Sequence, residues 1–136
     1  MRQQLIEIAT NRREMLVDIT PRVADAVARS GVANGLVSIY AQGATGAIMI
    51  QENWDQSVQN DVIALLRKLI PQGVWEHDRQ DGNGDAHLKA GLVGPSETIP
   101  IIDAKPGLSR WQNIFFCEFD GPRKKRTIIC TILNGS

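Results

Sequence analysis

Apolar positions recur with strand-like spacing along most of the chain, and two stretches have helical spacing instead. Residues 3–10 mix apolar and polar positions like a half-exposed strand, 11–13 resemble a turn, and 14–19 are predicted to be the returning strand. Thr20-Pro21 favours a helix start, because the hydroxyl can accept from first-turn amides and proline tolerates that position. Gly31 is predicted to end this helix in the left-handed conformation.

The middle of the chain predicts two strands and the best helix. Apolar runs at 36–40 and 47–50 flank a glycine-rich bend at 42–46. Asp55 can cap the helix that follows, and Pro71 with Gly73 ends it. The apolar stripe that we expect to face the core comprises Val58, Val62, Leu65, Leu66, Leu69 and Ile70.

After a polar loop at 75–84, residues 86–92 are predicted to form a short helix entered from Asp85, and the last third is β-rich. Its three predicted strands are 97–102, 111–120 and 127–133. Strands and helices do not alternate in this order as they would in βαβ units. The pattern therefore predicts an α+β fold, with a largely antiparallel sheet and packed helices, as a single domain over residues 1–136.

Composition narrows the class of protein and its partners. The 136 residues are 43% hydrophobic and 22% charged, as in a soluble globular domain. Fifteen basic and fifteen acidic residues cancel, so we expect no nucleic-acid partner and no attraction to an anionic membrane. The basic run 123–126 is predicted to be a solvated turn and strand edge. The start of the chain lacks an apolar signal region, so we expect a cytoplasmic protein with reduced cysteines.

The segment 81–96 has the richest chemistry. It places Asp85, His87 and Lys89 within five residues, between glycines that let the backbone approach a ligand. The other histidine, His77, lies ten positions before His87. We predict a small polar site that contains both imidazoles; two unrelated surface histidines are the alternative. A catalytic zinc ion would need a third protein ligand from elsewhere in the chain.

Two further segments contain candidate residues. Glu52 and Asn53 end a strand before the main helix, where they could serve as a general base or support a metal, or simply end the strand and cap the helix. Residues 111–120 have aromatic side chains at alternate positions, as in a half-buried strand. Cys117 fits packing better than nucleophilic catalysis, and Glu118 faces the opposite side of this strand.

Several motifs are distributed over nearly the whole chain. They are Val17-Asp18-Ile19-Thr20, Ile50-Gln51-Glu52-Asn53, Asp85-Ala86-His87-Leu88-Lys89-Ala90, Gly94-Pro95-Ser96, Ile99-Pro100-Ile101, Trp111-Gln112 and Phe116-Cys117-Glu118-Phe119-Asp120-Gly121-Pro122-Arg123. Together these motifs resemble the YjbQ family, also called the secondary thiamine-phosphate synthase family, and the resemblance is most specific in the C-terminal half of the chain.

The resemblance implies an α+β homotrimer whose histidine-lined pocket holds a metal or an anion. It also implies a secondary activity that couples a thiazole phosphate to a pyrimidine pyrophosphate with loss of pyrophosphate. The family usually has a histidine ten residues before its Asn-Glu-Asn motif, and Gly43 occupies that position here. A three-histidine zinc site is therefore not available. Either Gln42 or Glu52 completes a divalent zinc or magnesium site, or the metal is weak or absent.

Two functions follow as expectations. As an enzyme acting on a phosphorylated small molecule, the protein would use His87 and Lys89 against negative charge, with His77 as a ligand or general acid–base group. Under this hypothesis, Glu52 or Asp85 holds a cation or orients His87, and Arg123, Gln42 and Asn53 contact the substrate. The alternative is a metal-free trimeric protein that binds an anion or small molecule. A nucleic-acid role ranks third.

Overall fold

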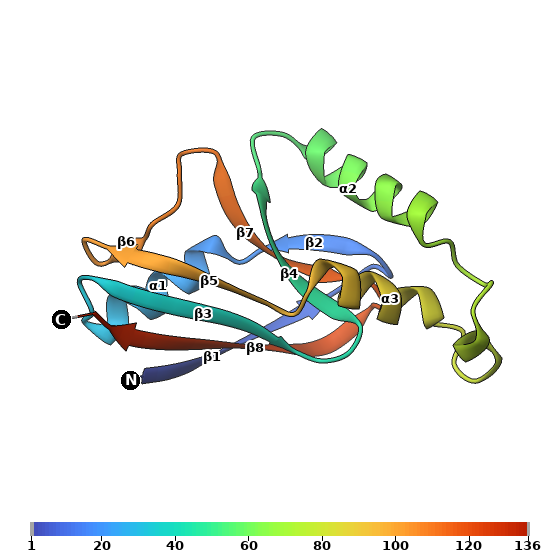
Figure 1. The fold of residues 1–136 in the computed structure, drawn as a ribbon, viewed down its shortest axis with the longest axis horizontal. Helices are drawn as coiled ribbons and strands as arrows, with labels where there is room; N and C mark the ends of the chain where they lie inside the picture. The colour runs from blue at the N-terminus through green and yellow to red at the C-terminus, as the bar shows by residue number, and fades with distance from the viewer. Residues whose placement is uncertain (1, 136) are drawn as a thin grey trace.

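The structure is a computed structural model that describes residues 2–135, and it consists of two β-sheets, three α-helices and one 3₁₀ turn (Figure 1). In chain order the elements are β1 (Arg2–Thr10), β2 (Met15–Asp18), α1 (Thr20–Ser30), β3 (Gly35–Gln42), β4 (Gly46–Glu52), α2 (Gln56–Leu69), the 3₁₀ turn η1 (Glu76–Arg79), α3 (Gly84–Val93), β5 (Ser96–Ile102), β6 (Lys105–Pro106), β7 (Gln112–Glu118) and β8 (Arg123–Asn134).

Every strand pairing in the two sheets is antiparallel, which confirms the α+β prediction. The five-stranded sheet has the order β1-β8-β3-β5-β6, and the three-stranded sheet has the order β2-β7-β4. The long strand β8 therefore lies inside its sheet, between β1 and β3. The basic run 123–126 was predicted to lie at a strand edge. It lies at the start of β8, where β1 is the only neighbouring strand, because the pairing of β8 with β3 ends at Thr127 opposite Gln42.

The three-stranded sheet is the middle layer of the molecule. One of its faces contributes Ile114 and Phe116 to a core shared with the five-stranded sheet and α1. The other face contributes Phe115 and Cys117 to a second core beneath α2 and α3. The prediction of a half-buried strand was therefore wrong for β7. Its side chains from Ile114 to Phe119 are all buried, because it is the central strand of a sheet that is covered on both sides.

The N-terminal strands do not form the predicted hairpin. β1 pairs with β8 over almost its whole length, from Arg2 opposite Ile132 to Thr10 opposite Arg123. β2 instead pairs with β7 in the other sheet. The turn between β1 and β2 therefore crosses from one sheet to the other, and each strand satisfies its backbone groups with a C-terminal partner. The bend between β3 and β4 makes the same crossing.

Two helix predictions need correction. The Thr20 hydroxyl does not cap α1: it accepts from the backbone N–H of Ile114, and Asp18 accepts from the backbone N–H of Thr20. In α2 the Asp55 cap is confirmed. However, Leu65 and Leu69 of its apolar stripe are exposed, because α2 contacts the rest of the chain mainly through β2. No helix within residues 2–135 is long and apolar enough to span a bilayer.

Candidate functional site

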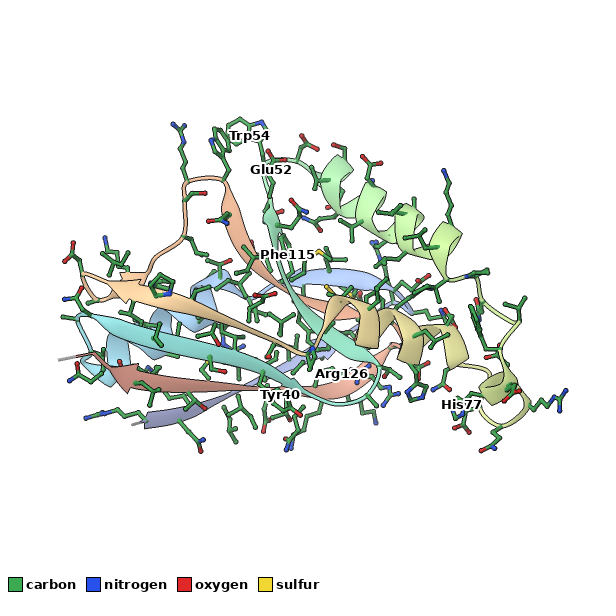
Figure 2. The ribbon with its side chains drawn as sticks, viewed as in Figure 1. Tyr40, Glu52, Trp54, His77, Phe115 and Arg126 are labelled. Carbon is green, nitrogen blue, oxygen red and sulfur yellow. The ribbon has the colours of Figure 1, made fainter. Side chains whose placement is uncertain are left out.

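A basic cavity of about 490 Å³ lies where the β3–β4 turn, the segment around the start of α3, and the start of β8 meet. The turn forms one wall, and cationic side chains of β8 form another. The three segments are distant in sequence but converge at the end of the five-stranded sheet where Figure 2 labels Arg126. The lining residues are Gln42, Gly43, Ala44, Thr45, Asp81, Asn83, His87, Arg123, Lys125, Arg126 and Thr127.

A β-bulge explains how neighbouring residues of β8 can line one cavity. Between the pairs Thr10–Arg123 and Ile8–Arg126, β1 advances by two residues and β8 by three. Side chains along a regular strand point alternately to opposite faces, and an extra residue breaks that alternation. Lys125 and Arg126 therefore both line the cavity together with Arg123.

The innermost cation, Arg126, belongs to a buried group that we call the Glu118 cluster: Thr10, Thr45, Glu118 and Arg126. Arg126 donates to both carboxylate oxygens of Glu118 and, over 2.8 Å, to Thr45 Oγ1. Thr10 Oγ1 donates to Glu118 Oε1 over 2.7 Å. Burial alone raises the pKa of Glu118, but the hydrogen bonds from Arg126 and Thr10 outweigh it and hold that pKa below its usual range.

Arg123 is held in a different way at the rim of the cavity. Its Nη2 donates to Asp120 Oδ2 over 3.0 Å and its Nε to the backbone oxygen of Asp120 over 2.9 Å. Asp120 Oδ2 also accepts from Asn83 Nδ2 over 2.8 Å. Asp120 therefore links the start of β8 to the segment before α3, and its carboxylate fixes two residues that line the cavity.

Gly43 leaves one side of the Arg126 guanidinium open to the cavity. A Cβ atom at this position would lie 3.2 Å from Arg126 Nη1, which is a tight contact. Any side chain at this position would enter the cavity next to the guanidinium. The glycine therefore leaves space beside a cation.

The two imidazoles lie side by side at the start of α3. The ring centroids of His77 and His87 are 4.8 Å apart, and the rings are nearly perpendicular. His77 Nε2 is buried and makes no hydrogen bond among the described residues, although Asp81 Oδ2 lies 3.4 Å away. Of the two rings, only that of His87 lines the basic cavity.

Among the described residues, the imidazole pair has no third His, Cys, Asp or Glu ligand for a metal ion. Within residues 2–135, no three His, Cys, Asp or Glu side chains are grouped in a way that could hold a metal. Gln42 shares the cavity with His87 and offers an amide oxygen, which suits a hard cation better than zinc. The residues present in one chain therefore fit an anion better than a zinc ion.

Asp85 and Lys89 lie outside the cavity, in a second charged group that is exposed to solvent only through its two arginines. We call it the Asp85 cluster: Arg13, Glu14, Arg67, Asp85 and Lys89. Lys89 Nζ donates to Asp85 Oδ2 over 2.7 Å and to Glu14 Oε2 over 2.9 Å. Arg13 donates to both Asp85 oxygens. We predicted that Lys89 would contact an anion and that Asp85 would orient His87. Instead, both point to the opposite side of α3, where their charges neutralise each other in the interior.

The carboxylates of the Asp85 cluster stay ionised for the same reason as Glu118. Burial acts to raise the pKa of Asp85, but hydrogen bonds from Arg13 and Lys89 outweigh it and lower that pKa. Burial also acts to raise the pKa of Glu14, and Lys89 and Arg67 lower it. This cluster joins the β1–β2 turn and the end of α2 to α3, so it fixes the helix that presents His87.

Glu52 and Asn53 lie far from the imidazoles, at the end of β4; Figure 2 labels Glu52 and His77 in well-separated parts of the molecule. Asn53 Nδ2 and Asn113 Nδ2 both donate to Asp18 Oδ2, over 2.6 and 2.9 Å. Asp18 therefore organises this end of the three-stranded sheet, with Trp54 and Trp111 packed edge to face at 5.0 Å beside it. Within a single chain, Glu52 and Asn53 do not line the basic cavity.

Sequence reasoning missed several cavity residues. Asp81 and Asn83 were part of the glycine-rich segment but were not selected, and Lys125 and Arg126 were assigned to solvent. The bulge that re-aims Lys125 and Arg126 depends on register against β1, which no local pattern in β8 reveals. No feature of the sequence indicated that Thr45 lines the cavity. The residues that were selected and do line the cavity are His87, Arg123 and Gln42.

Comparison with known proteins agrees with this architecture. A UPF0047 protein of Methanocaldococcus jannaschii is 50% identical over 119 residues, which cover 88% of this chain and 86% of that protein. The UPF0047 protein YugU of Bacillus subtilis is 35% identical over 127 residues, covering 91% and 94%. A crystal structure of a YbjQ-like protein of unknown function from Sulfolobus solfataricus superposes with a TM-score of 0.94 at 34% identity, covering 98% and 96%.

A crystal structure of a hypothetical protein from Aeropyrum pernix gives a TM-score of 0.93 at 32% identity, covering 98% of this chain and 99% of that one. The family model described as "UPF0047 protein YjbQ-like" matches residues 4–135, which include every strand and helix except the first two residues of β1. The two-sheet fold, the sequence motifs and these matches agree, and the chain belongs to the YjbQ-like UPF0047 family.

Proposed function

We propose that the basic cavity binds the phosphate or pyrophosphate group of a small molecule. The observation that carries this proposal is the make-up of the lining, in which three cationic side chains, Arg123, Lys125 and Arg126, accompany a single carboxylate, Asp81. Glu118 and Asp120 hold two of these cations in place from behind. Positioned cations around an open, polar hollow suit a multiply charged oxyanion.

The enzymatic form of the proposal assigns a proton-transfer role to His87. Its ring lines the cavity, and His77 lies against it with Asp81 beyond. When the bond between carbon and a phosphate or pyrophosphate oxygen breaks, negative charge develops on the leaving group. Arg123, Lys125 and Arg126 would stabilise that charge, and His87 would donate a proton to it. Displacement of pyrophosphate, as in thiamine-phosphate synthesis, is one reaction of this kind.

A matched pair of lysines tests the binding step. Lys125 lines the cavity, whereas its neighbour Lys124 is equally exposed and does not. We expect Lys125→Ala to weaken binding of inorganic pyrophosphate about tenfold in titration calorimetry, because one contact to a charged group is lost. Lys124→Ala should change the affinity less than twofold. Equal effects of the two substitutions, or no pyrophosphate binding by the unaltered protein, would contradict the proposal.

Two measurements separate an enzyme from a binding protein. The enzymatic form predicts that the gene rescues a strain lacking thiamine-phosphate synthase and that His87→Ala abolishes the rescue. A protein that binds pyrophosphate but fails to rescue supports the binding alternative. Elemental analysis tests the metal directly: stoichiometric zinc or magnesium that is lost in His87→Ala would favour a metal site completed by a second chain.

Copies of this chain are proposed to assemble as a homotrimer. Several large apolar side chains of α2, α3 and the segment between them are exposed, which is unusual for surfaces that face only water. They are Leu65, Leu69, Val74, Leu88 and Leu92. Light scattering after size-exclusion chromatography should give three times the mass of 15.0 kDa. A monomer at micromolar concentration would contradict the trimer and would leave the cavity proposal unaffected.

A further inference from the structure

A second cavity with cationic side chains lies between the β1–β2 turn and α2, the helix that packs along β2 (Figure 1). Its volume is about 380 Å³, and it shares no lining residue with the basic cavity. We call it the Arg12 cavity. Its lining includes Arg12, Arg13, Glu14, Asn60, Ile63 and Arg67.

We propose that the Arg12 cavity binds a small organic molecule with two carboxylate groups. The proposal does not depend on the proposed function, because it concerns another cavity and another class of ligand. Three arginines and a single carboxylate, Glu14, line this cavity. Lys89 and Arg67 already donate to the two oxygens of Glu14, so this carboxylate leaves the other donors of the lining available to a ligand.

Arg12 has the guanidinium that is most available to a ligand. The residue is exposed, and within residues 2–135 its side chain makes no hydrogen bond and no ion pair. A guanidinium presents parallel N–H groups whose spacing matches the two oxygens of a carboxylate. Arg12 can therefore hold one carboxylate group of the ligand by two hydrogen bonds from the side of the turn.

Arg67 offers a second anchoring point from α2. Its Nε donates to Glu14 Oε1 over 2.7 Å, whereas its two terminal nitrogens have no partner among the described residues. Asn60 lies two helical turns earlier and accepts from Gln56 Nε2 through its Oδ1 over 3.3 Å, so its amide N–H groups can donate. The helix can therefore bind a second carboxylate group.

Aliphatic side chains between these anchors favour an organic ligand over an inorganic anion. Ile63 and Ala64 line the cavity between Asn60 and Arg67. A carbon chain that joins two carboxylates can contact them, and its removal from water is favourable in proportion to the apolar area buried. The lining of the basic cavity has Ala44 as its only aliphatic side chain, so the two cavities suit different anions.

The wall formed by the β1–β2 turn is held in place by the Asp85 cluster. Arg13 donates to both oxygens of Asp85, and Lys89 donates to Glu14, so the turn is fixed to α3. Lys89 itself does not line the Arg12 cavity, and a ligand would meet only the exposed side of the cluster. Binding therefore does not need to order this part of the chain.

The Arg12 cavity is separate from the apolar surface of the proposed trimer. Its α2 residues are spaced by three, four and seven positions, so they share one side of the helix. Leu65 and Leu69 lie on the opposite side of α2, where they are exposed. Assembly through these leucines therefore does not require the cavity to be covered.

Titration calorimetry with succinate and acetate tests the number of carboxylate groups. We expect succinate to bind at least about tenfold more tightly than acetate, because only succinate can pair with Arg12 and Arg67 at once. Equal affinities, or no binding of succinate, would overturn the proposal. A failure to bind pyrophosphate would contradict the proposed function and would leave this result unaffected.

Three substitutions locate the binding of succinate. Arg12→Ala should weaken it about tenfold, because one pairing between charged groups is lost. Arg2→Ala, which removes another exposed arginine without a side-chain partner among the described residues, should change the affinity less than twofold. Lys125→Ala in the basic cavity should also change it less than twofold. A loss in either control that equals the loss in Arg12→Ala would overturn the assignment.

Chemical modification gives a second readout of position. Phenylglyoxal reacts with accessible guanidinium groups, and mass spectrometry of peptides reports the extent of reaction at each arginine. Saturating succinate should slow the modification of Arg12 and leave that of Arg2 unchanged. An Arg12 that reacts equally fast with and without bound succinate would contradict contact between the ligand and this guanidinium.

Discussion

The two buried charge clusters have the same ingredients and different surroundings. In the Glu118 cluster, a carboxylate from the three-stranded sheet holds Arg126 of the five-stranded sheet, and the guanidinium also lines a cavity. In the Asp85 cluster, Lys89 is 1% exposed and is enclosed by two carboxylates, with none of its surface in the basic cavity. One cluster presents a cation to the basic cavity, and the other neutralises a cation in the interior.

The contrast shows that a buried ion pair does not by itself mark a binding site. Removing charges from water is costly, and mutual pairing compensates for that cost equally well in either setting. What distinguishes the Glu118 cluster is the open space beside Arg126, which Gly43 leaves vacant of side-chain atoms. Access to the basic cavity, rather than charge, distinguishes the Glu118 cluster from the Asp85 cluster.

The largest expected effect comes from breaking the cluster beside the cavity. Glu118→Gln leaves the Arg126 guanidinium buried without its carboxylate, so we expect the free energy of unfolding to fall by about 3–5 kcal/mol. Urea denaturation at pH 7 measures this loss. Glu7→Gln, which removes an exposed carboxylate paired with Lys125, is the control and should cost less than about 1 kcal/mol. Equal losses would mean that the Glu118 cluster is not a buried ion pair in solution.

Breaking the Asp85 cluster should cost less and leave binding intact. Asp85→Asn should lower the unfolding free energy by about 2 kcal/mol. The loss is limited because Lys89 still pairs with Glu14, and because water can hydrate the partly exposed Arg13 guanidinium. The affinity for pyrophosphate should change less than twofold in the folded variant. A large loss of affinity at unchanged structure would restore Asp85 to the role first predicted for it.

Acid should weaken both clusters. The pKa values of Glu118, Asp85 and Glu14 lie below their usual range, so the unfolded chain binds more protons in mildly acidic solution. Their stabilisation is complete above the unfolded values of about 4 and is lost as the pH falls through the lower folded values. Urea denaturation at pH 7, 5, 4 and 3 should show this fall, and Glu118→Gln should show a shallower one. A wild-type stability that rises toward pH 3 would contradict the assignment.

The smallest expected effect is that of replacing Cys117, whose side chain lies on the face of β7 that packs beneath α2 and α3. Burial raises the pKa of the Cys117 thiol to about 12, so the native protein should leave this thiol unmodified by iodoacetamide at pH 8. Cys117→Ser should change pyrophosphate affinity less than twofold, whereas His87→Ala should weaken it several-fold, because only the imidazole faces the cavity. Comparable losses in the two variants would show that the other side of β7 contributes to the ligand site.

Local sequence patterns identified most elements of the fold but not how they pair. The Asp55 cap, the left-handed Gly31 and the helix predicted over 86–92 depend on neighbouring residues, and the structure has all three, although the helix begins at Gly84 rather than being entered from Asp85. The predicted hairpin over 3–19 is absent because strand partners are chosen by burial of whole faces. The local sequences of β1 and β2 do not indicate that each strand pairs with a partner more than 90 residues away.

The same division holds for the candidate site. Glycines and polar residues at 81–96 predicted a ligand-facing segment, and the ring contact of His77 and His87 depends mainly on that short stretch. Tertiary structure alone decided which charges face outward: α3 turns His87 toward the cavity and Lys89 away from it, and the register of β8 against β1 re-aims Lys125 and Arg126. Sequence determines which groups are present, but helical phase and strand register set the direction of each side chain.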